Sequence, residues 1–115
     1  MSIETPTMPK LENASMSEVI DALASGRVTA TALTKDYLAR IAAYDRDGPM
    51  LNSVRELNPA ALAIAGKLDD TRPSVKRPLA GVPILVKDNI ATGDKQHTTA
   101  GSLALASLRY LARAT

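Results

Sequence analysis

The sequence predicts an α/β protein built from three helices and about two strands of a mixed sheet. Two observations support the helical part: polar capping residues precede apolar stripes at helical spacing, and Gly or Pro follows where a helix should end. A third supports the strands: a short, continuous run of β-branched and other apolar residues occupies positions 82–86.

The first helix is predicted over residues 16–25. Ser15 and Glu18 have the spacing of a capping box, in which a hydroxyl and a carboxylate satisfy opposite backbone donors. Gly26 stands where a C-terminal glycine commonly ends a helix. Its apolar stripe consists of Val19, Ile20 and Leu23.

A second, longer helix is predicted from Thr29, as its cap, to the Gly48-Pro49 stop. Asn58 and Pro59 form a strong start for a third helix, which should end near Asp70. We interpret the apolar stripes of these helices as core; the second contains Leu33, Tyr37, Leu38, Ile41 and Tyr44, and the third contains Leu62, Ala65 and Leu68.

Two segments are predicted as strands. Residues 51–57 alternate imperfectly between apolar and polar side chains. Residues 82–86 are continuously apolar, which is typical of a strand buried on both faces. Because this run is bounded by Gly81 and by the polar Lys87-Asp88-Asn89, we expect a buried strand that ends in a functional loop.

Composition excludes several classes of function. The chain has 115 residues, a net charge of +2 and no Cys, so disulfide and thiolate chemistry are excluded. Its one histidine, His97, cannot build a zinc site alone, and we interpret it as an exposed loop residue. The weak charge predicts no nucleic-acid partner, and the absence of a long apolar run predicts no membrane partner. No cofactor or metal is expected, and a cytoplasmic location is the default.

Lys87 is the residue whose position suggests chemistry. At the end of a buried strand its amine would be partly desolvated, which favours the neutral form that can act as a general base. The alternative is that Lys87 surfaces at a strand end and pairs with Asp88 or Asp94. The pattern alone leaves both interpretations open.

Several ordered blocks resemble the amidase-signature family. They are Gly81-Val82-Pro83, the apolar Ile84-Leu85-Val86, Lys87-Asp88-Asn89 and Thr98-Thr99-Ala100-Gly101-Ser102. Upstream, residues 29–45 are similar to that family's N-terminal helix, and residues 51–70 to its next strand and helix. The resemblance covers roughly residues 16–105.

The resemblance implies the N-terminal part of an α/β/α fold and amide (C–N bond) hydrolysis through a Ser–cisSer–Lys triad, with Lys87 as the catalytic lysine. It also implies a supporting loop around that lysine, and we expect Gly101 to need a positive φ. The loop residues are Asp88, Asn89, Thr98, Thr99, Gly101 and Ser102. The chain contains no Ser-Ser or Gly-Gly dipeptide, so we expect it to be inactive by itself. A small-molecule amide would be its substrate only if downstream sequence completed the site.

Residues 1–15 are predicted as a flexible arm, and 16–115 as a truncated N-terminal portion of an amidase domain. The ending ASLRYLARAT departs from the family, and its Arg113-Ala114-Thr115 lacks an expected Asp. A truncated gene, an incomplete gene model and a functional small protein all remain open. The alternatives to a broken enzyme are an interaction module that docks on a longer homologue and an A-subunit-like fragment of a glutamyl-tRNA amidotransferase. An unpaired apolar strand also predicts self-association.

Overall fold

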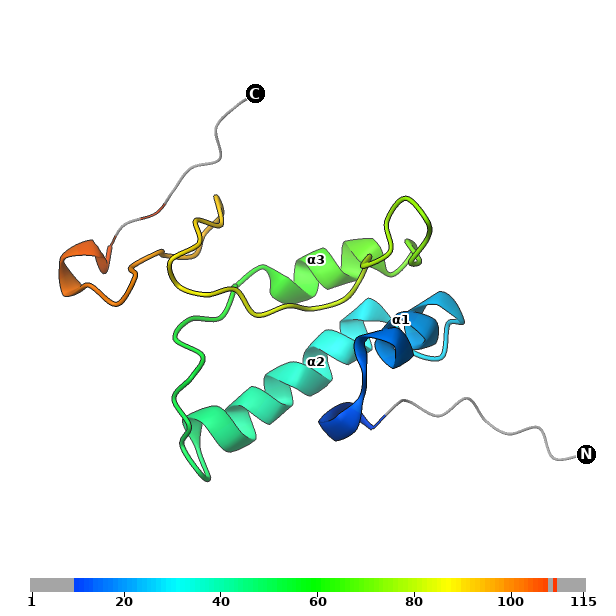
Figure 1. Ribbon diagram of the computed structural model, residues 1–115, viewed down its shortest axis with the longest axis horizontal. Coiled ribbons are helices and arrows are strands. Elements are labelled where there is room, and N and C mark those ends of the chain that lie inside the picture. The colour runs from blue at the N-terminus through cyan, green and yellow to red at the C-terminus, as the bar shows by residue number, and fades with distance from the viewer. Residues whose placement is uncertain (1–9, 108, 110–115) are drawn as a thin grey trace, which may run out of the picture. The chain divides into compact units, whose positions relative to one another are not determined.

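The computed structural model describes residues 10–107 and 109, and Figure 1 shows its three α-helices. These are α1 (Met16–Ala24), α2 (Ala30–Arg40) and α3 (Ala61–Leu68). Shorter helical segments are the 3₁₀ turns η1 (Leu11–Asn13) and η3 (Leu103–Leu105) and the π-helix η2 (Ile41–Arg46).

The chain divides into two units, each of which is described by itself. Unit 1 contains the described residues up to Tyr37 together with Leu62–Pro83. Unit 2 contains Leu38–Ala61 and the described residues from Ile84 onward.

The first predicted helix is confirmed, with its C-terminal glycine and the Ser15 half of its predicted capping box. The Ser15 hydroxyl accepts a hydrogen bond from the Glu18 amide at 3.1 Å, which satisfies one of the open donors of the first turn. At the other end Gly26 has φ +75° and donates to the Leu23 carbonyl at 3.2 Å. Glycine adopts this left-handed conformation without the steric penalty of a Cβ.

The second helix begins with two caps from different parts of the sequence. The Thr29 hydroxyl accepts from the Ala32 amide at 3.1 Å, as the sequence predicts. The Asp69 carboxylate adds a tertiary cap, since it accepts from the Thr31 amide at 3.0 Å and from the Thr31 hydroxyl at 2.6 Å. After Arg40 the helix widens into η2, whose Tyr44 and Asp45 carbonyls accept from the Leu51 and Asn52 amides at 3.2 and 3.0 Å.

The third helix starts two residues later than the predicted Pro59. Asn58 nevertheless acts as its cap region, because its side-chain oxygen accepts from the Ala60 amide and its carbonyl accepts from the Ala61 amide, both at 3.0 Å. The helix ends at Leu68, close to the predicted end near Asp70.

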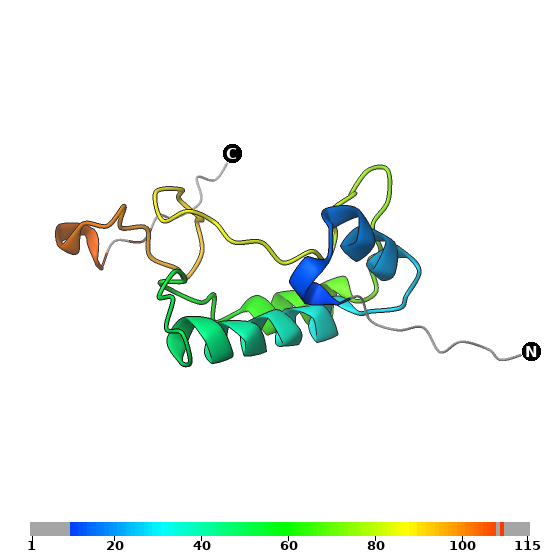
Figure 2. The ribbon, with the colours of Figure 1, turned by 60° about the horizontal axis from the view of Figure 1, so that its bottom comes forward.

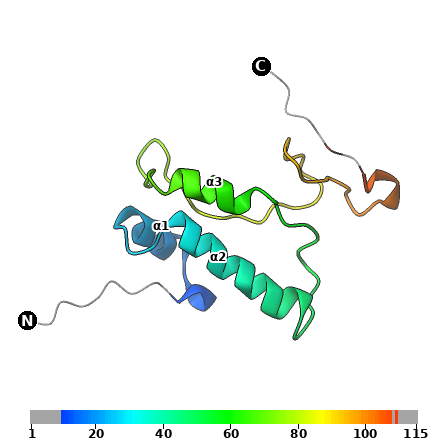
Figure 3. The ribbon, with the colours of Figure 1, turned by 180° about the vertical axis from the view of Figure 1, so that it is seen from behind.

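The core of unit 1 gathers around Leu33, whose side chain is completely buried. The three helices approach one another around the first turns of α2 (Figures 1 and 3). Apart from one leucine, the buried neighbours of Leu33 are Ala or Val, and each of these contributes a modest apolar area. They are Val19, Ala22, Leu23, Val28, Ala30 and Ala65. The predicted stripe of α2 is only partly core: Tyr37 is half-buried against this cluster, whereas Tyr44 is 46% exposed beneath the Arg40 guanidinium.

The two predicted strands are not confirmed, because the described residues contain no β-strand. Both segments are extended or irregular, and Figure 2 shows residues 82–87 as an extended trace. A strand exists only when its amides and carbonyls pair with a neighbouring strand, and the described part of the chain supplies no such neighbour. The expected burial is also wrong, because the side chains of Ile84, Leu85 and Val86 are 69, 78 and 44% exposed.

The two ends of the chain lie partly outside the described residues. Residues 1–9 of the predicted arm lie outside them, while Leu11 and Ala14 pack against the core of unit 1. The Arg113-Ala114-Thr115 ending, where the sequence departs from the family, also lies outside them. Within the described ranges no helix combines the length and hydropathy needed to cross a bilayer.

Candidate active site

Lys87 lies at the end of the extended segment, where the chain turns back on itself. Its carbonyl accepts a hydrogen bond from the Ile90 amide at 3.0 Å, which closes the turn. Its side chain is exposed, so the prediction that a buried strand desolvates the amine is wrong for the described residues. Burial at this position would require partner strands and covering side chains, and the described residues provide neither.

Asp88 ties the lysine turn to a distant threonine. Its carboxylate accepts from the Thr99 amide at 3.0 Å and from the Thr99 hydroxyl, and its carbonyl accepts from the Ala100 amide at 3.0 Å. Thr99 is buried, with 6% of its surface exposed. The Thr99 hydroxyl, followed by the Thr99 amide, lowers the pKa of the Asp88 carboxyl, because both donate to its charged form. Asp88 is therefore held as an acceptor directly beside Lys87.

The segment after Thr99 makes a tight left-handed bend. Ala100 has φ +49° and Gly101 has φ +78°, which confirms the positive φ predicted for Gly101. The Ser102 amide donates to the Thr99 carbonyl at 2.8 Å. On the preceding side, the buried Thr98 donates through its hydroxyl to the Ile90 carbonyl at 3.4 Å.

The structure thus brings most of the predicted supporting residues into one hydrogen-bonded loop after Lys87. Asp88, Thr98, Thr99, Gly101 and Ser102 all take part in it. Asn89 stands apart, because it occupies an exposed turn position. The alternative interpretation paired Lys87 with Asp88 or Asp94, but among the described residues Lys87 forms no ion pair. The Asp94 carboxylate binds Thr92 and Gln96 instead.

Sequence reasoning missed Glu56, which binds the other end of this loop. One of its oxygens accepts from the His97 amide at 2.9 Å, and the other lies 2.9 Å from His97 Nδ1. These bonds, with the amide bond first, lower the pKa of the Glu56 carboxyl. The Arg109 Nε donates to His97 Nε2 at 3.2 Å, which assigns the ring proton to Nδ1. His97 is a loop residue, as predicted, but it is not freely exposed: the side chain is 28% exposed and bonded at both ring nitrogens.

Asp45 is a second residue that the sequence did not single out. It is 4% exposed at the end of η2 and accepts from the Ser53 amide, the Ser53 hydroxyl and the Val54 amide at 2.7, 2.5 and 3.1 Å. The Ser53 hydroxyl makes the largest contribution to lowering the pKa of its carboxyl. No local spacing signals either carboxylate, because Asp45 resembles any polar helix-end residue and the partner of Glu56 lies 41 residues away.

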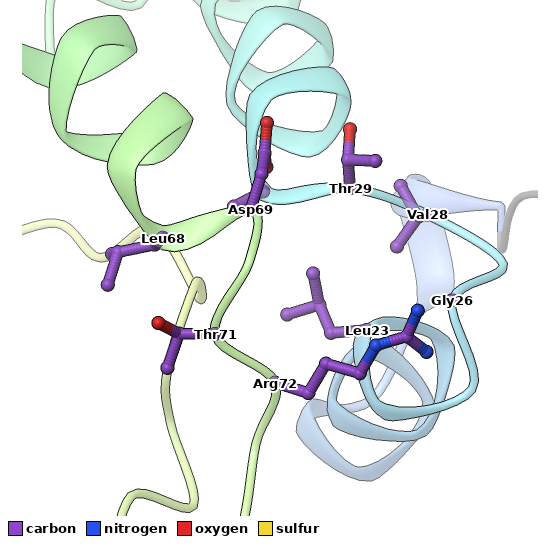
Figure 4. A pocket seen from close by; sticks show the side chains of 9 residues that line it. Leu23, Gly26, Val28, Thr29, Leu68, Asp69, Thr71 and Arg72 are labelled. Carbon is purple, nitrogen blue, oxygen red and sulfur yellow. The ribbon is translucent and has the colours of Figure 1, made fainter.

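Unit 1 contains a small hollow whose polar groups are already used for structure (Figure 4). Arg72 reaches across it toward Gly26 and donates to the Ala24 carbonyl at 3.1 Å. Asp69, on its rim, caps α2. The two charged side chains that line the hollow are therefore both engaged in holding unit 1 together.

Comparison with solved structures identifies the fold as that of an amidase. The peptide amidase of Stenotrophomonas maltophilia superimposes with a TM-score of 0.76 at 43% sequence identity, over 84% of this chain and 20% of that protein. The Amidase family model matches residues 32–112, and the chain therefore belongs to the amidase family.

Two curated relatives show the breadth of the family. A Schizosaccharomyces pombe protein that carries an amidase name is 42% identical over 105 residues, which is 85% of this chain and 18% of that protein. The glutamyl-tRNA(Gln) amidotransferase of Chloroflexus aurantiacus has an A subunit that is 41% identical over 105 residues, which is 89% of this chain and 21% of that relative. The chain thus spans about a fifth of the length of these relatives. These matches confirm the family resemblance on which the assignment of Lys87 rests.

Proposed function

We propose that this chain supplies the catalytic lysine of an amide hydrolase. Lys87 would be the base of a Ser–cisSer–Lys triad, and a small-molecule amide would be the substrate of the completed site. The observation that carries the proposal is the closed loop that presents Lys87: the following residue, Asp88, accepts from both the amide and the hydroxyl of Thr99. A loop fixed in this way limits the positions that the lysine can take, which favours a catalytic role.

In the proposed reaction a neutral Lys87 amine accepts a proton from a bridging serine, which takes one from the nucleophilic serine. The nucleophile bonds to the amide carbonyl carbon, the C–N bond breaks, and the departing amine receives the proton that Lys87 took up, returned through the bridging serine. Water then cleaves the acyl-enzyme and releases the acid. The described residues leave the lysine in solvent, so this role requires further protein atoms that cover its amine.

The 115 residues do not offer a nucleophile of the expected kind. They contain no Ser-Ser dipeptide, and Ser102 takes part in the supporting bend through its amide. We therefore expect no amide hydrolysis by this chain alone.

A second candidate is an A-subunit-like role in transamidation, and the match to the Chloroflexus aurantiacus amidotransferase favours it. In that case partner subunits would be needed for activity. Glutamine hydrolysis that depends on an added partner protein would distinguish this candidate from a simple amidase.

The proposal can be tested in a chimera in which residues 32–112 replace the matching segment of the Stenotrophomonas maltophilia peptide amidase. Lys87→Ala and Lys87→Arg should each reduce the acyl-enzyme burst by at least about a hundredfold, the scale of general-base catalysis. Arginine retains the charge but cannot be deprotonated. Lys95→Ala removes an exposed lysine from the same unit and serves as the control. A Lys87→Arg chimera that retains most of its activity would show that the lysine is not a base.

A further inference from the structure

We propose that Glu56 is a positioning residue for Lys87, acting from a distant segment through His97 and the Asp88–Thr99 loop. The proposal rests on the proposed function, which gives the position of Lys87 its importance. All of the contacts involved lie within unit 2.

The first step is the anchoring of the segment that carries Glu56. The buried Asp45 carboxylate holds the amides of Ser53 and Val54, and Val54 is itself buried. Hydrogen bonds to a charged acceptor are stronger than neutral ones, and three donors on one carboxylate restrict the backbone on which they lie. Glu56 lies two residues after Val54, so its backbone continues from a segment that Asp45 holds in place.

The second step is the hydrogen bonding of Glu56 to His97, at the start of the loop that carries Thr98 and Thr99. Its two oxygens bind the amide and the Nδ1 of the same residue, His97, both at 2.9 Å. A bidentate contact fixes direction as well as distance. Because Thr98 and Thr99 follow directly and are buried, a fixed His97 limits where the Thr99 amide and hydroxyl can point.

The third step connects the loop to the lysine. Thr99 donates twice to Asp88, and Ala100 donates to the Asp88 carbonyl. Asp88 directly follows Lys87, whose carbonyl accepts a hydrogen bond from the Ile90 amide. Three carboxylates, Asp45, Glu56 and Asp88, thus form successive links between the end of η2 and the lysine turn.

Arg55 could position the loop beside Lys87 more directly than Glu56 does, because its Nε lies 3.5 Å from Asp88 Oδ2. Its side chain is 61% exposed, and exposed ion pairs contribute little to stability. The two short hydrogen bonds from His97 make Glu56 the stronger constraint on the loop.

The test is residue-resolved amide hydrogen exchange on the full 115-residue chain, measured by mass spectrometry. The amides of Ile90, Thr99 and Ala100 report directly on the lysine turn because each donates to Lys87 or Asp88. Glu56→Ala should accelerate exchange at all three by about tenfold, as expected when hydrogen bonds to a charged group are lost. The Leu33 amide of α2 should keep its rate.

Glu56→Gln provides the conservative variant, since one amide oxygen can still accept from the His97 amide. We expect it to restore part of the protection and to lie between the parent chain and Glu56→Ala. Glu18→Gln, which alters an exposed carboxylate of α1, is the matched control and should leave the three amides unchanged.

Faster exchange at His97 alone, or an equal acceleration that includes Leu33, would overturn the proposal. These outcomes are separate from a failure of the proposed function, which the Lys87→Arg chimera detects. If Glu56→Ala does not accelerate exchange in the lysine turn, Lys87 can still be the base. If the Lys87→Arg chimera is active, Lys87 is not the base, but the exchange result for Glu56 still stands.

Discussion

Two identical substitutions in unit 1 should change stability in opposite directions. Gly81 has φ +86°, and a Cβ added there would lie 3.2 Å from the Ala30 Cβ and 3.6 Å from the Leu23 Cδ2. An L-residue in the left-handed region costs roughly 1–2 kcal/mol, and the tight contact with the buried Ala30 adds to that. We therefore expect Gly81→Ala to lower the free energy of unfolding by about 2 kcal/mol.

Gly66 provides the comparison, because it is an exposed residue of α3 without a positive φ. A Cβ there would meet only the Thr31 Oγ1, at 4.0 Å, which is an ordinary contact. Alanine in a helix interior is favoured over glycine by about 0.5–1 kcal/mol, so Gly66→Ala should stabilise unit 1.

The assay is urea unfolding followed by far-ultraviolet circular dichroism, with both variants measured beside the parent chain. The two unfolding free energies should differ by about 3 kcal/mol, the sum of the two opposite effects. If Gly81→Ala is as stable as the parent, or if both variants shift in the same direction, the reasoning from backbone conformation is wrong.

Two further predictions concern unit 2. Thr99 lowers the pKa of Asp88, so the stabilisation of the lysine loop should be present above the unfolded-state pKa near 3.8 and be lost as pH falls through the lower folded value. The exchange rate of the Ala100 amide, corrected for its intrinsic pH dependence, should rise at acid pH. The Thr99→Val variant should show a smaller rise. A rise of the same size in Thr99→Val would contradict the assignment of this effect to the Asp88–Thr99 contact. The exposed apolar residues 84–86 should drive self-association, so Leu85→Lys should lower the mass measured by light scattering. Val75→Lys alters a fully exposed side chain elsewhere and should have no effect; equal effects would show that the association does not depend on residues 84–86.

The helix ends were predictable because their signals are local. Ser15, Thr29 and Asn58 each bind an amide two or three residues away, and Gly26 adopts its left-handed conformation because of its own missing Cβ. Such contacts depend on neighbouring residues in the chain, so short patterns record them. The start of α3 was missed by two residues, within the usual variation of helix boundaries.

The strands could not be predicted in the same way. The apolar run of residues 82–86 indicates a segment that would be stable when covered on both sides, but a pattern in one segment does not supply its partner. The described residues provide no paired neighbour, and the run remains extended and exposed.

The sequence by itself determined the family and the three helices, and it singled out Lys87; the positive φ of Gly101 was an expectation that the structure bears out. Only the tertiary structure decided that Glu56 grips His97, that Asp45 holds residues 53 and 54, and that Asp69 caps α2. The physical reason is distance along the chain. A carboxylate whose donors lie 38 or 41 residues away leaves no periodic trace, because folding rather than local spacing brings the two groups together.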